Sequence, residues 1–476
     1  MGGVAVQVLA APVVDGGGPG IGVPGSQLHF AQRVADVQRG RRAEVPAELE
    51  SGRAGVAVVP VRKGAMGNAQ AAETVGMSSA RLERIGPAMG TYVDSGEVAG
   101  IVTLVARRGE IIHRSRHGWR DREAGVEMTD DTIFRIYSMT KPIVSTALML
   151  LFEEGSFLLD QPVATYLPGF ADVKVMTADG SLTEPERPPT IGDLLAHTSG
   201  LTYDFMIDNP VAPLYRDHRI MNDATRTLAE CVDAIAELPL AFQPGQRWHY
   251  SVGIDVAARL VELLADQPLG DFLTERLFGP LGMTDTAFGV AHGQDERLAA
   301  MYGLPDLVGE GYHGGNLVEA ALAGFNERID VSNTYPTDTP DVFVRGGLGL
   351  FSTVDDYFRF AQMLLNGGRV DGERLIGRKT LELMGGNRVP PELLPFEILG
   401  MTSPGFGFGL GSRVMLDVAA SGGPGSPGEF GWAGAAKTYY WVDPVEELVG
   451  VFMSQYMTGP QNPDQTFRAV VYQAVD

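Results

Sequence analysis

Ser138 and Lys141 are the two residues of this sequence whose types and spacing most directly predict chemistry. They stand at the start of an apolar run, Ser138-Met139-Thr140-Lys141, that is typical of a helix. Residues three apart on a helix lie on one face, with about 5–6 Å between their β-carbons. A serine hydroxyl is a weak nucleophile until a base takes its proton, and a lysine withdrawn from water disfavours its ammonium form and can be that base. The pair therefore predicts a nucleophilic serine activated by an amine.

The pair also has an ordinary structural interpretation, so its chemistry depends on partners elsewhere in the chain. A serine before a helical run is often only an N-cap, and a lysine in a first turn is often solvated. Tyr250 offers one partner, because a phenol near a lysine can accept and relay a proton. The segment Gly431-Trp432-Ala433-Gly434 offers another. Its glycines let a substrate approach backbone N–H groups closely, as an oxyanion hole requires.

Other kinds of site have weaker support. His197 is a candidate base for a Ser-His-Asp triad, but the chain contains no Gly-x-Ser-x-Gly elbow. The single cysteine, Cys231, lies in a helical pattern typical of a buried hydrophobic residue, and it leaves no partner for a disulfide within the chain. Neither His-Glu-x-x-His nor Cys-x-x-Cys occurs in the sequence. We therefore expect no metal and no cofactor.

Length and composition describe an ordinary globular protein without a polyanionic partner. The 476 residues are 44% hydrophobic and 20% charged, which suits two packed domains or one domain with an inserted unit. A formal charge of −22 argues against binding to nucleic acid or to an anionic membrane surface. No apolar run reaches the ~18–20 residues of a membrane helix, and the N-terminus lacks the basic region of a secretory signal. We expect a cytoplasmic protein, with secretion left open, and make no prediction of the oligomeric state.

The hydrophobic pattern places strands toward both ends of the chain and helices between them. Residues 1–76, rich in glycine and proline, are expected to form a disordered or loosely attached extension. Two β-rich runs flank Arg108-Gly109 as a hairpin, and the run from Ser138 to Glu154 is expected as a helix. Further helices are expected at 77–89 (with Ser78 as its cap), 191–197, 225–237, 251–265, 269–278, 353–366 and 464–474, and strands at 406–415, 435–442 and 447–456.

These elements predict an α/β (α+β) fold in which both ends of the chain share one antiparallel sheet. Residues 77–136 and 340–476 are expected to form a discontinuous α/β domain with that sheet. Residues 137–339 are expected to form a mainly helical, inserted domain that contains the helix of the nucleophile.

Taken with the remaining motifs, the sequence resembles the serine β-lactamase and penicillin-binding-protein superfamily. Within it, the chain resembles class C β-lactamases and, more closely, the family VIII carboxylesterases, from roughly residue 77 to the C-terminus. Five motifs in the order and spacing of the family support this resemblance. They are Ser138-x-x-Lys141, Leu194-Leu195-x-His197-Thr198-Ser199-Gly200-Leu201, Tyr250-Ser251, Gly346-Gly347-x-Gly349-Leu350-x-Ser352-Thr353 and Trp432-x-Gly434.

The resemblance implies a role for each residue of the site. Ser138 would be the acylated nucleophile, Lys141 its hydrogen-bonded activator and Tyr250 the third member of the triad. The backbone N–H groups of Ser138 and of Ala435, on the strand, would form the oxyanion hole, to which the helix dipole adds positive partial charge. The implied fold is the family's antiparallel sheet with helices packed on it, beside an all-helical domain, and His197 would lie in a structural turn. Substrate contacts are expected from Trp432, Ala433, Gly434 and Ser251.

Two departures from the β-lactamase pattern favour ester substrates. The chain has Trp432-Ala433-Gly434 where that family has Lys-Thr-Gly, and Tyr250-Ser251-Val252 where it has Tyr-x-Asn. The missing lysine and asparagine contacts cost about 1–3 kcal/mol each toward an anionic antibiotic, whereas an apolar wall suits neutral esters. We therefore expect a serine carboxylesterase for short-chain esters. A β-lactamase or D-alanyl-D-alanine peptidase, an acyltransferase to a small-molecule alcohol, and a non-hydrolytic binding module or sensor stay open as alternatives.

Overall fold

The structure is a computed structural model that describes residues 69–206, 208–221, 223–303, 326–457, 459 and 461–476. All of these residues lie within one compact unit of the chain, residues 57–476. The prediction of an extension over residues 1–76 therefore falls outside the described residues up to residue 68. Residues 69–74 form a helix, and Ala72 and Val75 are buried in a hydrophobic cluster, so this last part of the predicted extension packs on the fold.

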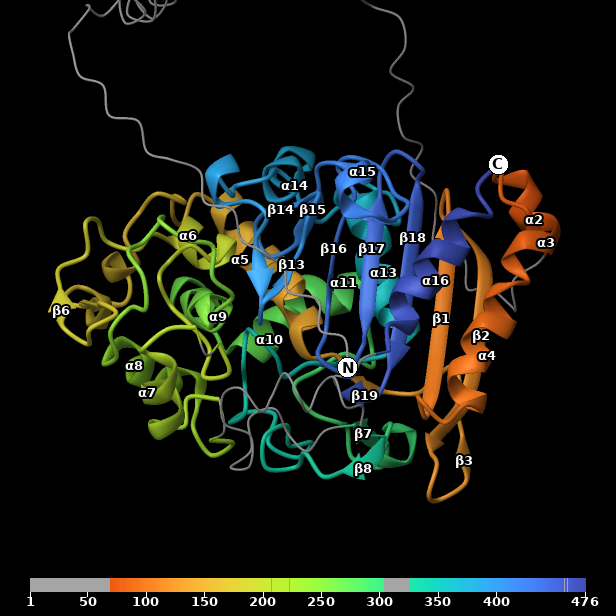
Figure 1. Cartoon of the computed structure of the whole chain (residues 1–476), viewed down its shortest axis with the longest axis horizontal. Coiled ribbons are helices and arrows are strands. Elements are labelled where there is room, and N and C mark those ends of the chain that lie inside the picture. Colours follow the sequence, from red (N-terminus) through yellow and green to blue (C-terminus); the bar gives the residue numbers. More distant parts are fainter. Residues whose placement is uncertain (1–68, 207, 222, 304–325, 458, 460) are drawn as a thin grey trace, which may run out of the picture. The chain divides into compact units, whose positions relative to one another are not determined.

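An eight-stranded antiparallel sheet is the main sheet of the described fold, and it occupies the right half of the view in Figure 1. β1, near the start of the described chain, pairs with β18, near its end, so that Ile101 lies opposite Ser454 and Arg107 opposite Leu448. Both ends of the chain thus share one sheet, and the predicted fold class, an α/β arrangement with an antiparallel sheet, is confirmed. Within the described residues the sheet order is β14 (Phe406–Phe408), β15 (Arg413–Met415), β16 (Phe430–Ala433), β17 (Tyr439–Asp443), β18 (Leu448–Ser454), β1 (Gly100–Arg107), β2 (Glu110–Asp121) and β3 (Val126–Glu127).

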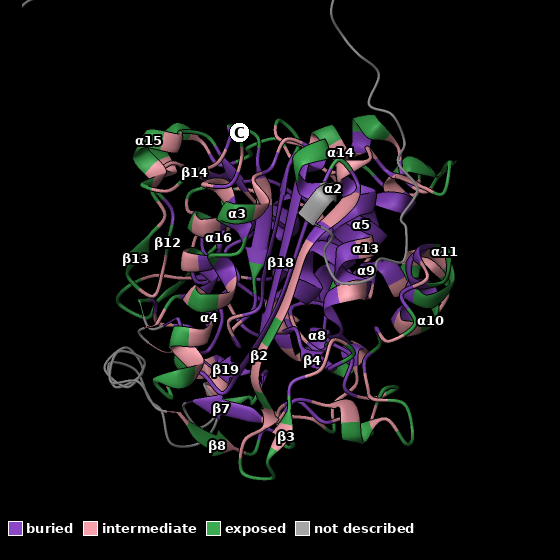
Figure 2. Ribbon diagram, turned by 90° about the vertical axis from the view of Figure 1, so that its right-hand side faces the viewer, coloured by how far each residue is buried: buried purple, intermediate pink, exposed green. Residues whose placement is uncertain are grey.

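Helices cover both faces of this sheet, and Figure 2 shows its central strands buried between them. Val102 and Leu104 of β1 join the larger hydrophobic core, whereas Ile101 and Val105 point to the opposite face and join a second core. Because both faces are covered, β1 is buried along its whole length instead of alternating between buried and exposed residues. The second core lies under α2 (Ala69–Thr74), α3 (Ser79–Leu82), α4 (Ile85–Asp94) and α16 (Pro463–Tyr472), and α13 (Val354–Leu365) packs on the other face.

The helices between the two halves of the sheet pack around α9 (Gly253–Ala265). This helix contacts α5, α6, α8 and α10. Gly253 permits the close approach of α6, because a Cβ there would lie 2.6 Å from the Leu194 carbonyl oxygen. The helices of this region are α5 (Thr140–Glu153), α6 (Ile191–Ala196), α7 (Ala212–Asp217), α8 (Leu228–Ala236), α10 (Leu269–Leu273) and α11 (Gly279–Leu281), with a π-helical turn, η4 (Thr274–Phe278), after α10.

Shorter elements complete the described chain. Two more helices are α14 (Arg378–Met384) and α15 (Val418–Ser421). The short strands are β4 (Phe134–Arg135) with β9 (Phe351–Ser352), β5 (Val175–Met176) with β6 (Leu182–Thr183), β7 (Met301–Gly303) with β8 (Glu327–Ile329) and β19 (Tyr456–Met457), β10 (Arg369–Val370) with β11 (Glu373–Arg374), and β12 (Glu397–Ile398) with β13 (Met401–Thr402).

Four predicted elements differ from the structure. The predicted strand 447–456 is two strands, β18 and β19, which belong to different sheets. The predicted helix 77–89 is two helices, α3 and α4, and Ser78 makes no side-chain capping bond. The predicted strand 406–415 is the β14–β15 hairpin, whose turn contains Gly411 at a φ of 88°. The predicted strand 435–442 begins four residues later, as β17, because residues 434–438 form the turn that joins it to β16.

Candidate active site

Ser138 lies in a 3-10 turn, η1 (Tyr137–Met139), directly before α5. The chain enters this turn from β4, which pairs with β9, and the Ile136 N–H donates to the Leu350 carbonyl oxygen at 3.1 Å. Tyr137 has a φ of 46°, in the left-handed region that a bulky side chain rarely adopts. Such strained residues persist where the surrounding structure holds them, and they cluster at functional sites.

Two side chains from different elements converge on the Ser138 hydroxyl. Lys141 stands in the first turn of α5, and its Nζ lies 3.1 Å from Ser138 Oγ in a hydrogen bond. Tyr250 precedes α9, and its hydroxyl donates to the same Oγ at 2.7 Å. The Nζ of Lys141 also lies 4.7 Å from the centroid of the Tyr250 ring. The structure therefore brings together the three catalytic residues predicted from the sequence, although Tyr250 lies 112 residues from Ser138 in the chain.

Lys141 is enclosed by residues that the sequence analysis did not assign to the site. Its side chain is buried, with 1% of the residue exposed, and its Nζ donates to the Gly347 carbonyl oxygen at 2.6 Å. The Gly347 N–H in turn donates to Asp255 Oδ1 at 3.0 Å, and the Tyr203 ring centroid lies 5.2 Å from Nζ. One signal was available in the sequence: Asp255 is an acidic residue within a helix that is otherwise apolar on its buried side.

The His197 ring packs against the ring of Tyr250, and within the described residues it forms no hydrogen bond with Ser138. The two ring centroids are 4.9 Å apart, and His197 Nδ1 lies 3.2 Å from Ser251 Oγ in a hydrogen bond. Burial lowers the pKa of His197 well below its ordinary value, so this imidazole is neutral. Its position at the left-handed C-cap of α6 agrees with the structural turn that the resemblance implied.

The two predicted oxyanion donors lie in turns that touch each other. Neither the Ser138 N–H nor the Ala435 N–H has a hydrogen-bond acceptor within the described part of the chain. Ala435 was expected on a strand, but it lies in the turn after β16. Gly434 permits the contact with η1, because a Cβ there would lie 2.3 Å from the Ile136 carbonyl oxygen. That oxygen also accepts a hydrogen bond from Thr438 Oγ1 at 3.2 Å.

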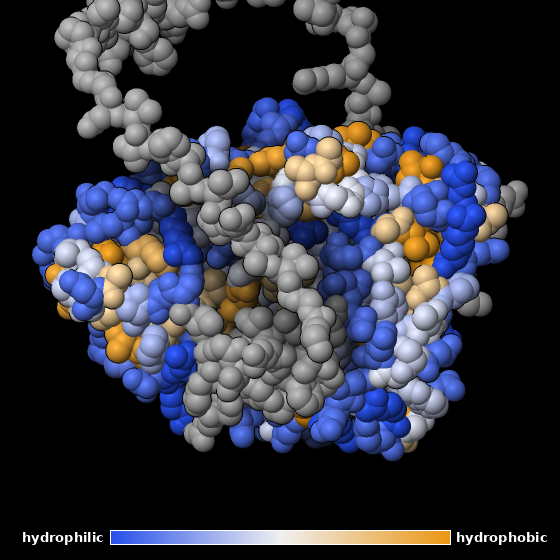
Figure 3. All heavy atoms as spheres, in the orientation of Figure 1, coloured by the Kyte–Doolittle hydropathy of each residue, from blue (hydrophilic) through white to orange (hydrophobic). Residues whose placement is uncertain are grey.

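The four residues expected to contact substrate occupy different environments. Trp432 is 7% exposed and donates from Nε1 to the Tyr250 hydroxyl at 3.4 Å, whereas Ala433 is exposed and Gly434 buried. The Ser251 hydroxyl is fully buried and bonded to His197 and to the Gly253 N–H, a placement that does not support substrate contact. Figure 3 shows hydrophobic residues gathered in a hollow between the helices at the left and the sheet at the right.

Two other kinds of feature are absent from the part of the chain that the structure describes. No group of three or more His, Cys, Asp or Glu side chains there is arranged to hold a metal ion. None of the helices formed by those residues is long and apolar enough to cross a membrane.

Comparison with known proteins places the chain in the Beta-lactamase family, whose sequence model matches residues 86–474. Protein Rv1367c of Mycobacterium tuberculosis is 38% identical over 371 residues, which cover 76% of this chain and 87% of that protein. Esterase EstB of Burkholderia gladioli is 33% identical over 360 residues, 73% of this chain and 83% of EstB. The structure of EstCE1, described as a hydrolase with promiscuous acyltransferase activity, superposes with a TM-score of 0.69 at 26% identity, covering 83% of this chain and 99% of EstCE1.

The chain therefore belongs to the β-lactamase and penicillin-binding-protein superfamily, as the resemblance of its motifs implied. It is an enzyme of the serine hydrolase type. The match covers both halves of the sheet and the helices between them.

Proposed function

We propose that this serine hydrolase is a carboxylesterase that cleaves short-chain esters through an acyl-enzyme on Ser138. The observation on which the proposal rests is the convergence of Lys141 Nζ and the Tyr250 hydroxyl on Ser138 Oγ. Similarity to an esterase and to a hydrolase supports the same reaction class. The apolar Trp432-Ala433 segment, in place of a lysine and a threonine, favours a neutral substrate over an anionic one.

The geometry suits acylation by the following sequence of proton transfers. Ser138 Oγ attacks the carbonyl carbon of the ester, and its proton passes to the neutral amine of Lys141. The carbonyl oxygen becomes an oxyanion that accepts hydrogen bonds from the N–H groups of Ser138 and Ala435. The Tyr250 hydroxyl contacts Ser138 Oγ, and the face of the Tyr250 ring lies near Lys141. Tyr250 therefore relays the proton to the oxygen of the departing alkoxide, which leaves as an alcohol when its bond to the carbonyl carbon breaks.

Deacylation returns the enzyme to its starting state by the same route in reverse. A water molecule loses a proton to the Tyr250–Lys141 pair and attacks the carbonyl carbon of the acyl group on Ser138. The bond between that carbon and Ser138 Oγ then breaks, and Oγ takes the proton back. The carboxylic acid product leaves, and no external oxidant, reductant or cofactor is needed for either half of the reaction.

Substitution of the nucleophile tests the proposal. The Ser138→Ala variant should lose at least about 10³-fold in kcat for p-nitrophenyl butyrate, because nucleophile loss normally costs several orders of magnitude. Ser145→Ala is a matched control, since this serine lies in α5, the helix directly after Ser138, and its buried hydroxyl has no hydrogen-bond partner among the described residues. Folded Ser138→Ala protein with activity within tenfold of wild type would refute the assignment of Ser138.

A panel of substrates distinguishes a carboxylesterase from a β-lactamase or peptidase. Wild-type protein should hydrolyse p-nitrophenyl butyrate faster than a chromogenic cephalosporin. The opposite order would instead identify a β-lactamase or peptidase. Stoichiometric labelling of Ser138 with no turnover of any substrate would identify a binding module or sensor.

Acyl transfer to an alcohol is a second candidate, and the similarity to EstCE1 favours it. The acyl-enzyme is the same in both reactions, and only the nucleophile that attacks it differs. Product analysis with a competing small alcohol distinguishes them, because transfer produces a new ester and hydrolysis produces the free acid.

A further inference from the structure

Lys141 has a second hydrogen-bond partner besides the serine, and this partner is a backbone carbonyl. Its Nζ donates to the Gly347 oxygen at 2.6 Å, a shorter contact than the 3.1 Å to Ser138 Oγ. A neutral amine has two N–H bonds and one lone pair. A fixed N–H···O=C contact therefore restricts the direction of the lone pair, and this lone pair must face the Ser138 hydroxyl to take its proton.

Asp255 holds the same residue, Gly347, from its amide side. Asp255 Oδ1 accepts a hydrogen bond from the Gly347 N–H at 3.0 Å. The carboxyl group stands in the first turn of α9, five residues after Tyr250, and the residue is only 1% exposed. It therefore lies on the helix that follows the phenol, is linked to the amine through Gly347, and has no access to substrate.

Gly347 is closely enclosed by Asp255 and by Tyr203. A Cβ on Gly347 would lie 2.5 Å from Asp255 Oδ2 and 2.6 Å from the Tyr203 hydroxyl oxygen. Both of these oxygens are buried and have no hydrogen-bond partner in the described part of the chain. A side chain at position 347 would therefore collide with buried polar oxygens, so the place of this residue is closely defined by Asp255 and Tyr203.

We infer that Asp255 is a positioning residue of the reaction, which acts through Gly347 to orient the amine of Lys141 toward Ser138. The inference rests on the proposed function, in which Lys141 takes the serine proton. Its links are three hydrogen bonds in series: Asp255 Oδ1 to the Gly347 N–H, the Gly347 carbonyl to Lys141 Nζ, and Nζ to Ser138 Oγ.

Hydrogen bonding, and not charge, is the property of Asp255 that this role uses. Burial raises the pKa of the Asp255 carboxyl, against the opposing effect of the hydrogen bond from the Gly347 N–H. Burial thus disfavours the charged form of the carboxyl, whereas either protonation state presents an oxygen to the Gly347 N–H. An asparagine at this position offers the same acceptor, and an alanine offers none.

The test compares Asp255→Asn with Asp255→Ala by two readouts, kcat and KM for p-nitrophenyl butyrate and the rate at which a fluorophosphonate probe labels Ser138. We expect Asp255→Ala to lower kcat and the labelling rate by about 10–100-fold, with KM changed by less than about twofold, because misplacement of a reacting group slows chemistry without weakening binding. Asp255→Asn should stay within about threefold of wild type. Asp266→Asn, at the exposed end of the same helix, is the matched control.

Two results would overturn the inference. One is an Asp255→Ala variant that labels and turns over like wild type. The other is an Asp255→Asn variant as slow as Asp255→Ala, which would assign the effect to charge. If Asp255→Ala does not fold, Gly347→Ala displaces the same residue and should reduce both rates, and unchanged rates there would also overturn the inference. Fast labelling of wild-type Ser138 without ester turnover would count against the proposed substrate alone, since the labelling rates of the variants still test Asp255.

Discussion

At the scale of single residues, the hydroxyl of Tyr250 is the group whose removal isolates one step of the proposed reaction. Tyr250→Phe deletes the contact of 2.7 Å with Ser138 Oγ and the contact of 3.4 Å with Trp432 Nε1. It keeps the ring, which packs at centroid distances of 4.9 Å from His197 and 5.6 Å from Trp432. We expect kcat for p-nitrophenyl butyrate to fall by about 10²–10⁴-fold, the usual contribution of a positioned acid or base.

A second tyrosine, Tyr92, provides a control for the general effect of removing a phenol hydroxyl from the protein. Tyr92 lies on α4, and its hydroxyl bonds to Thr466 Oγ1 at 2.7 Å, remote in the fold from η1. Tyr92→Phe should leave kcat unchanged. If Tyr250→Phe retained kcat within tenfold of wild type, the phenol would have no part in the proton transfer.

Which site residues the sequence predicts depends on how far apart they stand in the chain. Ser138 and Lys141 are separated by three positions, so helical geometry alone places them together. Tyr250 comes from another element. Its phenol made it a candidate partner, but only the resemblance to a family implied that it lies beside Ser138. Asp255 and Gly347 are 92 residues apart, and their hydrogen bond follows from the packing of α9 against the segment before β9, which no local pattern encodes.

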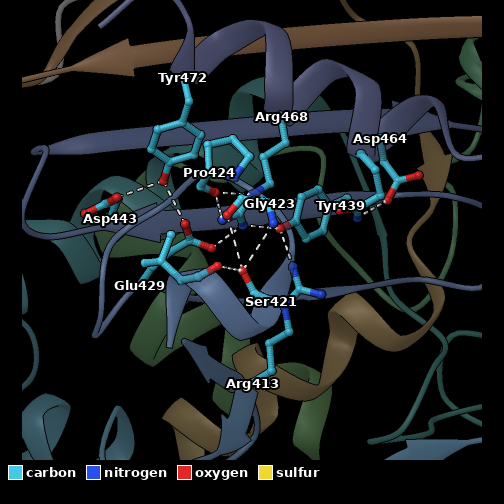
Figure 4. A network of polar contacts seen from close by, with 12 residues as sticks. Arg413, Ser421, Gly423, Pro424, Glu429, Tyr439, Asp443, Asp464, Arg468 and Tyr472 are labelled. Carbon is cyan, nitrogen blue, oxygen red and sulfur yellow. Dashed lines mark hydrogen bonds and ion pairs between the residues drawn. The ribbon is translucent and has the colours of Figure 1, made fainter. Parts of the chain in front are cut away.

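At the scale of elements, β16 is attached to the C-terminal helix by a buried network of charged and phenolic groups (Figure 4). Arg468 of α16 forms an ion pair with Glu429, the residue before β16, and the two side chains are 4% and 1% exposed. The Tyr472 hydroxyl lies 2.7 Å from Glu429 Oε2 and 2.8 Å from Asp443 Oδ2. Because β16 leads into the turn of Ala435, this network anchors the strand next to a predicted oxyanion donor.

Removal of the cation from this network should destabilise the protein strongly. Arg468→Met leaves the Glu429 carboxylate buried without its partner, and we expect the free energy of unfolding in urea to fall by about 3–5 kcal/mol. The double variant Arg468→Met/Glu429→Gln should recover part of that loss, because a neutral amide replaces the unpaired charge. The exposed pair Arg276–Glu154 provides the control, and Arg276→Met should cost far less. Equal costs for the two arginine variants would show that the buried pair does not anchor β16.

The elements themselves were predictable where local chemistry decides, and less so where a tertiary contact decides. The hairpin at Arg108-Gly109 is confirmed, since both residues adopt positive φ values, 52° and 77°, as its tight turn requires. The start of β17 was predicted too early. Residues 434–438 instead turn against Ile136, and that contact comes from η1, about 300 residues earlier in the chain.

At the scale of the whole molecule, packing on the sheet and among the helices largely withdraws three histidines from water. His113 on β2 is enclosed between the sheet and α4, and it hydrogen-bonds to Thr103 Oγ1 at 3.1 Å. Burial, with a smaller effect of His117, lowers the pKa of His113 to about 4. Burial likewise lowers the pKa of His249 to about 4, and it lowers the pKa of His197 well below its ordinary value. These rings are neutral in the folded protein and become charged on unfolding in mild acid.

This burial predicts that the protein becomes less stable as the pH falls. Below the ordinary histidine pKa of 6.5, the unfolded chain binds protons that the folded chain does not, so the free energy of unfolding falls as the pH drops from about 6.5 toward 4. Each such histidine contributes a slope of up to about 1.4 kcal/mol per pH unit, or roughly 3 kcal/mol over that range. Asp356 opposes the trend, because burial raises its pKa to about 6 and its folded form gains a proton in the same range.

The share of one histidine can be measured despite these overlapping titrations. His113→Gln retains a side chain able to bond to Thr103 but cannot take up a proton, whereas His113 gains one on unfolding. The difference in unfolding free energy between wild type and His113→Gln should therefore shift by about 3 kcal/mol in favour of the variant between pH 7 and pH 4, as urea denaturation at a series of pH values would show. Asp356 and the other histidines contribute equally to both proteins and cancel in this difference. Parallel curves for the two proteins would mean that His113 is reached by solvent in the folded state and that the cover formed by α4 opens below pH 6.5.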